Sequence, residues 1–125
     1  MADSVTSATL YEDSLYYIGI FTNISDGSGE TTVKKIDVSA LSPACSCVSI
    51  EEIWYNTFGM SVSVLFDATT DDNAIVLQGD GHFDFHQFGG VKDPKSTGWV
   101  GDVLFTTNGA SNGDTYSIVL KCKKY

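Results

Sequence analysis

WVGDVLFTTNGASNGDTYSIVLKCKKY, residues 99–125, is the part of the sequence that decides the fold class. Its two arms flank the segment NGASNGD, and Asn and Gly tolerate the positive φ angles of tight turns. In both arms, apolar residues that suit a pleated, half-buried surface alternate with polar ones. These apolar residues are Val100, Val103, Phe105, Tyr116, Ile118 and Leu120. The stretch therefore predicts a β-hairpin that closes an all-β domain.

The rest of the chain continues this pattern. Turn signals recur about every 8 to 12 residues, as in an antiparallel sandwich or jelly roll. Gly59 is expected to end one strand, and Met60, Val62, Val64 and Phe66 to share one face of the next. We expect a single-domain antiparallel β-sandwich, jelly-roll-like, with about eight strands and no helix. The strands before the hairpin are predicted at residues 15–23, 31–39, 46–59, 60–68, 74–78 and 79–90.

The start of the chain differs from the remainder. Residues 1–14 are small, polar and acidic, and they predict a flexible N-terminal arm. Residues 15–125 are predicted to form the β-sandwich domain. With 125 residues, of which 42% are apolar and 12% aromatic, the chain can bury a core without a metal or a disulfide.

The charge of the chain limits its partners. The net charge is −9, and all seven basic residues are lysines. Arg is the usual choice for gripping phosphate, and an acidic surface repels polyphosphate, so we expect no nucleic-acid partner. No apolar run approaches the length of a membrane span, and residues 1–14 lack the features of a secretory signal. We therefore expect no membrane partner and synthesis in the cytoplasm.

One cluster has the composition of a metal site. Asp80, His82, Asp84 and His86 recur with a period of two, which places them on one face of a strand at spacings of about 6.5–7 Å. One interpretation is a metal-dependent jelly-roll enzyme centred on the two His. The simpler interpretation is the solvated face of an amphipathic strand, and we expect no metal or other cofactor. The acidic turn at residues 67–73 lacks the alternation and the glycine of a calcium loop.

The three cysteines do not predict a disulfide framework, because their number is odd. Cys45 and Cys47 would lie on one face of a strand, but a zinc site formed with Cys122 lacks a recognisable fourth ligand. We expect buried free thiols that act as small apolar side chains. A bridge from Cys122 to either of the other two is the alternative in an oxidising setting.

Catalytic residue sets are missing from the sequence. Nucleophilic catalysis needs Ser or Cys beside a His and a third orienting group, and both His lie on the segment just described. We expect no enzymatic activity and no catalytic residues. Large side chains are instead candidates for contact with other proteins. These candidates are Leu10, Tyr11, Trp54, Tyr55 and Trp99.

Four stretches resemble a known family: IDVSAL (36–41), IWYNTFGMSVSVLFDA (53–68), FGG (88–90) and the segment from residue 97 to residue 125. They are similar to small virion structural proteins of tailed bacteriophages. In that family a Trp- and Tyr-rich strand precedes a strand ending in Phe-Asp-Ala, and a Gly-Asp-Ile/Val-Leu-Phe-Thr-Thr strand and its Gly-Asp-Thr/Ser-Tyr hairpin partner close the domain. The likeness covers roughly residues 33–125 and concerns the fold, since the family has no catalytic residues to carry over.

The resemblance implies a capsid decoration (cement) protein. It would be a non-enzymatic structural protein of the virion that binds the major capsid protein on the outer capsid surface and stabilises the lattice. It would form a homo-oligomer, with a trimer favoured by analogy. We expect the arm at residues 2–14 to become ordered only on docking, as an added strand.

The alternative function is a carbohydrate- or host-surface-binding module of a phage tail or fibre. Exposed aromatic side chains such as Trp54 or Trp99 would then stack against sugars.

Overall fold

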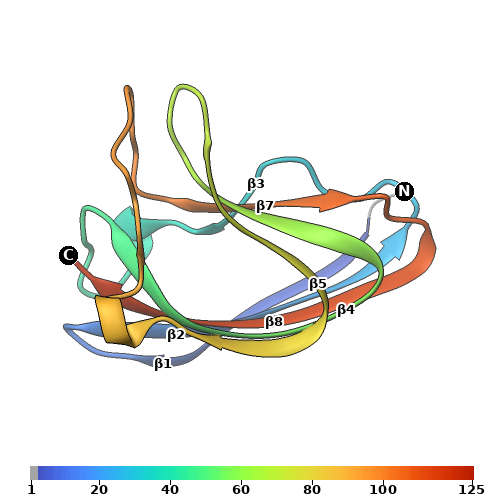
Figure 1. The fold of residues 1–125 in the computed structure, drawn as a ribbon, viewed down its shortest axis with the longest axis horizontal. Helices are drawn as coiled ribbons and strands as arrows, with labels where there is room; N and C mark the ends of the chain where they lie inside the picture. Colours follow the sequence, from blue (N-terminus) through green and yellow to red (C-terminus); the bar gives the residue numbers. More distant parts are fainter. Residues whose placement is uncertain (1–2) are drawn as a thin grey trace.

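The computed structural model describes residues 3–125, with the exception of the His86 side chain. Over these residues the chain forms eight strands and two short 3-10 helices (Figure 1). No helix long and apolar enough to cross a membrane occurs among residues 3–125. In chain order the elements are β1 (Ser4–Glu12), β2 (Tyr16–Asp26), β3 (Val33–Ile36), η1 (Val38–Ala40), β4 (Val48–Phe66), β5 (Asp72–Asp84), η2 (His86–Phe88), β6 (Val91–Lys92), β7 (Val103–Asn108) and β8 (Asn112–Lys124).

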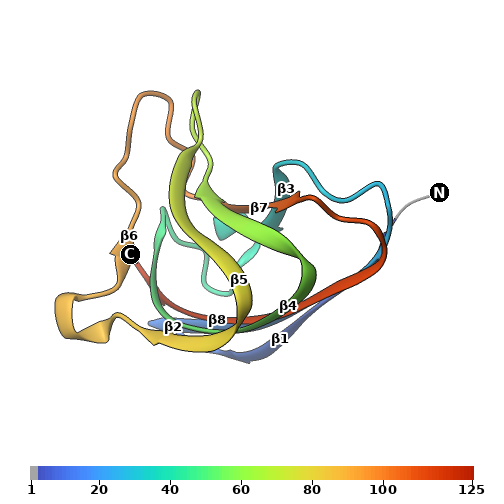
Figure 2. The ribbon, with the colours of Figure 1, turned by 45° about the vertical axis from the view of Figure 1, so that its right-hand side comes forward.

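The strands form two facing layers joined by β4 and β5 (Figures 1 and 2). The strand order is β1-β2-β8-β4-β7-β3, all pairings are antiparallel, and β5 and β6 pair with β4. One layer contains β1, β2, β8, the first half of β4 and the end of β5. The other contains β3, β7, the second half of β4 and the start of β5. This arrangement confirms the predicted single-domain antiparallel β-sandwich.

Strand β4 runs through both layers, which corrects the prediction that Gly59 ends a strand. Residues 48–58 of β4 pair with β8, and residues 61–66 pair with β7. Gly59 provides the bend between these halves with a φ of +77°, where a Cβ would overlap the carboxylate of Asp114. Strand β5 bends beside it at Gly79, whose N–H donates to Thr57 Oγ1 at 2.8 Å. The separate strands predicted at 74–78 and 79–90 are therefore one strand that ends at Asp84.

The predicted hairpin between the last two strands is also corrected. Strand β7 pairs with β3 and β4, whereas β8 pairs with β2 and β4, so the two strands lie in opposite layers. The predicted faces are nevertheless confirmed for the strands themselves. The ring of Phe105 in β7 meets the rings of Phe21 and Tyr116 edge-on across the core, with centroids 5.5 and 5.7 Å apart. Val100 lies before β7 and is 49% exposed.

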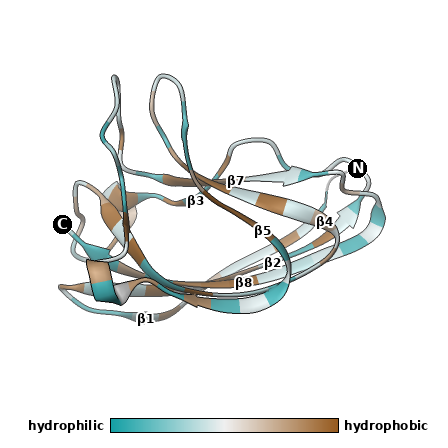
Figure 3. Cartoon of the chain, viewed as in Figure 1, coloured by the Kyte–Doolittle hydropathy of each residue, from teal (hydrophilic) through white to brown (hydrophobic). Residues whose placement is uncertain are grey.

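The core lies between the layers, and Figure 3 shows hydrophobic stretches along the strands that enclose it. Met60, Val62, Val64 and Phe66 are buried together, as predicted from their alternation. The segment predicted as a strand at 31–39 is shorter, because after β3 the Asp37 side chain accepts the N–H of Ser39 and begins η1. The core also contains Phe21, Ile36, Val48, Ile50, Ile53, Leu77, Val103, Phe105, Tyr116, Ile118, Leu120 and Cys122.

The N-terminal segment is a strand, not the predicted flexible arm. β1 pairs with β2 from Ser4 to Glu12, so the sandwich begins well before residue 15. Residues 1–2 of the predicted arm lie outside the described part of the chain. Both ends of β1 are tied to the domain. The Asp3 carboxylate accepts the N–H groups of Asp26 and Gly29 at 3.0 and 3.3 Å, and Glu12 pairs with Lys124 at 2.8 Å.

Candidate interaction surfaces and pockets

The outer face of the layer that contains β1 carries a row of apolar and aromatic side chains. Five strands contribute one residue each, and strand register places these residues side by side. The residues that alternate with Ile20, Val119 and Trp54 along β2, β8 and β4 are buried or half-buried, so these three residues point away from the core, whereas β1 is exposed on both faces. We call it the outer row, and it consists of Ala8, Ile20, Val119, Trp54 and His82.

An aromatic and charged group forms one end of the outer row. The indole of Trp54 and the imidazole of His82 stack with centroids 4.8 Å apart and planes inclined by 7°. His82 Nε2 lies 3.1 Å from Glu52 Oε1, and Lys121 Nζ lies 3.4 Å from Glu52 Oε2. Trp54 is 39% exposed. An exposed aromatic ring flanked by charged groups is typical of the centre and rim of a protein interface.

The metal candidates do not come together as one site. Asp80, His82 and Asp84 face outward on β5, as predicted, and the imidazole of His82 is engaged with Glu52 and Trp54. His86 lies beyond the strand in η2, and its side chain is outside the described part of the structure. Among the described residues, no three His, Cys, Asp or Glu side chains are grouped to hold a metal ion.

Tyr55 has a different role from that expected of a contact residue. Its ring is half-buried and packs against the core, and it begins a series of neighbouring rings in the order Tyr55, Phe83, Phe85 and Phe88. Successive centroids in this series are 5.4, 5.5 and 5.9 Å apart. Tyr55 therefore supports the fold, whereas the other four contact candidates, Leu10, Tyr11, Trp54 and Trp99, are exposed.

Two loops project together from one side of the sandwich (Figures 1 and 2). We call them the paired loops, residues 67–72 and 93–102. Backbone hydrogen bonds join them from Thr69 N–H to Thr97 O at 3.2 Å and from Val100 N–H to Asp67 O at 2.9 Å. The Ser96 hydroxyl also donates to Asp72 at 2.6 Å. These bonds give the projection a fixed shape.

Trp99 in the paired loops borders a hollow of about 470 Å³ with a mixed polar and apolar lining. The indole is 38% exposed, and the ammonium of Lys95 lies 5.2 Å from its centroid. Asp102 is buried and binds Lys34 at 3.1 Å and the N–H of Val38 at 2.9 Å. An aromatic wall beside carboxylate and ammonium groups could bind a polar ligand such as a sugar. The other lining residues include Asp37, Ser39 and Ser46.

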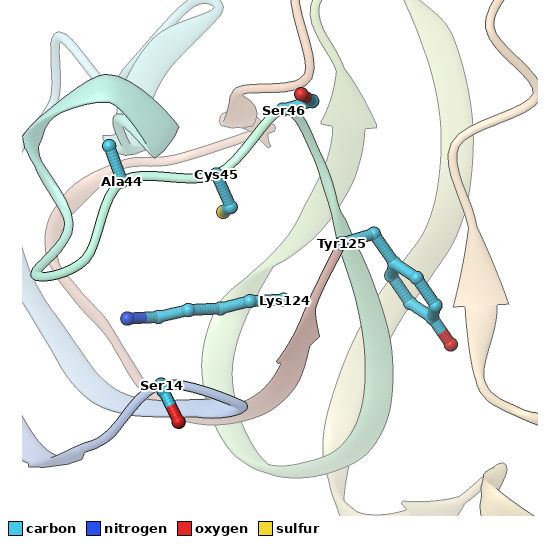
Figure 4. A pocket seen from close by; sticks show the side chains of 6 residues that line it. All are labelled: Ser14, Ala44, Cys45, Ser46, Lys124 and Tyr125. Carbon is cyan, nitrogen blue, oxygen red and sulfur yellow. The ribbon is translucent and has the colours of Figure 1, made fainter.

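A second hollow, of about 410 Å³, lies beside Lys124 and is shown in Figure 4. The Lys124 side chain is 3% exposed, and its ammonium donates to Glu12 at 2.8 Å and to the carbonyls of Asp13 and Pro43 at 2.8 and 3.1 Å. Desolvation favours neutral Glu12. The hydrogen bonds that Glu12 accepts from Lys124 and from the N–H of Ser42 have a larger effect than this desolvation, and they hold the pKa of Glu12 below its usual value. This ammonium is saturated by the protein itself.

The three cysteines are free, as expected. Cys47 and Cys122 are buried and Cys45 is half-buried beside the Lys124 hollow. Burial raises the pKa of all three thiols above the usual value. They are therefore protonated at neutral pH and are poor nucleophiles.

A buried polar cluster that no sequence pattern predicted lies at the opposite end of the sandwich. Glu30 accepts hydrogen bonds from Tyr116 OH at 2.5 Å, from Asn23 Nδ2 at 2.8 Å and from Lys35 Nζ at 2.6 Å. The Lys35 and Glu30 side chains are only 2% and 5% exposed. Burial, followed by the bond to Glu30, raises the pKa of Tyr116 far above its usual value. This cluster closes the end of the core and is not open to a ligand.

Comparison with known proteins leaves the family open. No protein-family model and no curated protein matches the chain. Solved structures that resemble it include a cupin superfamily protein from Desulfitobacterium hafniense DCB-2, with a TM-score of 0.40 and 13% identity. That match covers 99% of this chain and 80% of the other. At this level of similarity it carries no information on a site or an activity.

Proposed function

We propose that this protein is a non-enzymatic structural protein that binds the outer surface of a bacteriophage capsid and stabilises the lattice. The sequence resemblance to virion structural proteins supplies the class of partner. The major capsid protein would be the direct partner, and the protein would act as a homo-oligomer on the particle.

The outer row is the observation that carries this proposal. It presents Trp54 at the end of a line of apolar side chains across four strands, with His82 stacked on its ring and Glu52 and Lys121 beside it. Such a face can bury an aromatic anchor against a partner while the charges at its rim fix the orientation. If the oligomer binds several capsid chains at once, weak individual contacts would together give tight binding to the particle.

The chain provides a matched pair of variants for testing this proposal. Trp54 and Trp99 have nearly equal exposure, 39% and 38%, but lie on different surfaces. Purified protein is mixed with capsids that lack it and pelleted. Trp54→Ala should reduce co-sedimentation by about tenfold or more, as expected for loss of an interface anchor, while Trp99→Ala should bind like the wild type. Equal binding by both variants and the wild type would contradict docking through the outer row.

The hollow beside Trp99 favours a second candidate function, carbohydrate binding on a tail or fibre. Its aromatic wall and its polar groups, Asp37, Lys34 and Asp102, have the chemistry for stacking and hydrogen bonding with a sugar. A glycan array separates the two functions. Glycan binding that is lost with Trp99→Ala and retained with Trp54→Ala would favour this candidate over the capsid role.

A further inference from the structure

Strand β1 presents a free edge that differs from the other sheet edges. Within residues 3–125, β1 pairs only with β2, and every residue from Ser4 to Tyr11 is exposed. A strand edge offers unpaired N–H and C=O groups, which proteins usually protect with charged residues, Pro, bulges or short length. The segment from Ser4 to Tyr11 contains no charged residue and no Pro.

The remaining edges carry such protection. Strand β3 has four residues, two of which are Lys34 and Lys35, and its pairing with β7 is interrupted by a register shift. Strand β5 carries Asp72 at its start and Asp80 and Asp84 in its last five residues, and it bends at Gly79 between them. The edge of β1 has only one irregularity, the register shift between Thr9 and Tyr11, which leaves Ser4–Thr9 in regular pairing.

The charges at the two ends of β1 are turned toward its own domain. Asp3 binds the N–H groups of Asp26 and Gly29, and Glu12 binds Lys124. In a chain with a net charge of −9, this edge is therefore where a second copy would meet the least repulsion. The same bonds hold β1 in place before any partner arrives, so pairing would cost little ordering of the backbone.

We propose that β1 pairs antiparallel with β1 of a second copy of this chain, which joins two sandwiches into a symmetric dimer with one continuous sheet. A two-fold axis perpendicular to the joined sheet closes the assembly at two copies and places the residue at the axis opposite itself. The centre of the regular segment Ser4–Thr9 puts this axis at Thr6 or Ser7. The outer rows of the two copies would then form one longer surface. This inference does not depend on the capsid role.

The first test measures the association of the purified full chain by sedimentation equilibrium over a range of concentrations. The wild type should form dimers that dissociate on dilution. Thr6→Lys combined with Ala8→Lys places like charges close together across the axis and should weaken the dimer by about tenfold or more. Val33→Lys on the β3 edge is the matched control and should dimerise normally. A wild type that is monomeric at every concentration, or a dimer unaffected by the β1 lysines, would overturn the proposal.

The second test distinguishes edge pairing from face-to-face contact. Opposite Cα atoms in antiparallel strands are about 4.5–5.5 Å apart, within the range of a disulfide. Either Thr6→Cys or Ser7→Cys should therefore cross-link rapidly into a covalent dimer on mild oxidation, and Val33→Cys should not. Ser117→Cys, which is exposed on the outer face of β8, should also stay monomeric. Cross-linking at Ser117→Cys without cross-linking at either β1 position would show that the copies meet through their faces, contrary to the proposal.

Discussion

The two ends of the sandwich each bury a lysine ammonium, but they satisfy it in different ways. At one end, Lys35 binds Glu30 and both side chains are almost fully buried among other side chains. At the other end, Lys124 binds Glu12, which is 18% exposed, together with two backbone carbonyls. The first end joins side chains of the core, whereas the second fixes the path of the chain where the strands turn. We expect the two ends to respond differently to mutation and to pH.

The largest effect is expected at the Glu30 end. Glu30→Ala leaves the buried ammonium of Lys35 without its carboxylate and should lower the free energy of unfolding by about 3–5 kcal/mol, measured by urea denaturation. The double variant Glu30→Leu with Lys35→Met removes both charges and should be clearly more stable than the single variant. A single variant that loses less than about 1 kcal/mol would show that the pair is not buried in solution.

A smaller loss is expected at the Lys124 end. Lys124→Met removes hydrogen bonds from a charged donor, and its former acceptor Glu12 can be hydrated because it is partly exposed. We expect a loss of about 2 kcal/mol in the same denaturation experiment. Lys123→Met changes the neighbouring, outward-facing lysine and should alter stability by no more than about 0.5 kcal/mol. If the two lysine variants lose equal stability, the buried contacts of Lys124 are not stabilising.

The pH dependence of stability should involve both ends of β1. Desolvation raises the pKa of Asp3, but the hydrogen bonds that Asp3 accepts have the larger effect and lower its pKa to about 2. The pKa of Glu12 is also lowered. A carboxyl with a lowered folded-state pKa stabilises the fold above its unfolded pKa, and this contribution is lost as the pH falls. Wild-type stability should therefore decrease between about pH 5 and pH 2.

Two variants test this assignment of the pH effect. Asp3→Asn and Glu12→Gln remove the titrating groups, so each should flatten the acid side of the stability curve in denaturation measured at a series of pH values. Each variant should lose less unfolding free energy at low pH than the wild type loses. If both variants lose stability at low pH as steeply as the wild type does, other carboxyl groups cause the pH dependence.

The smallest effect is expected at an exposed bond near the Lys124 end. Tyr11 OH donates to Asp13 Oδ2 at 2.6 Å on the surface. Tyr11→Phe should change the unfolding free energy by less than about 0.5 kcal/mol, because water replaces an exposed partner at little cost. A loss as large as that of Lys124→Met would mean that this surface bond helps to hold the turn after β1.

The sequence predicted which residues face the core better than it predicted which strands pair. Alternation of apolar residues correctly placed Val103, Phe105 and Ile118 inside, because side-chain direction depends only on the local period of the strand. The partner of a strand depends on the whole chain. The turn residues after β7 therefore predict a hairpin, although β4 separates β7 from β8 in the strand order.

The glycine positions and the N-terminal segment also show that strand pairing is harder to predict from sequence than side-chain direction. The sequence predicts that Gly59 ends one strand and that Gly79 begins another, but both glycines lie at bends of strands that continue into the other layer. Residues 4–12 have no apolar alternation. The reason is that β1 is an edge strand exposed on both faces, so none of its side chains has to be apolar to pack in the core. Its pairing with β2 could be identified only from the structure.

The candidate surfaces were predicted in part. Exposure of Trp54 and Trp99 was expected and is observed, whereas Tyr55 packs against the core. The buried ionic groups could not be predicted, because their burial depends on contacts with residues distant in sequence, although Lys35 and Glu30 themselves are only five positions apart. Glu30 and Tyr116 are 86 positions apart, and Glu12 and Lys124 are 112 apart.

The passage of β4 and β5 through both layers has a mechanical consequence. A sandwich joined only by loops can open when its layers are pulled apart, since only side-chain packing resists the load. Here the backbone of two adjacent strands crosses from one layer to the other at Gly59 and Gly79. Opening would have to break the hydrogen bonds of these strands to β7 or to β8, so the body should yield as one unit and resist shear across its width.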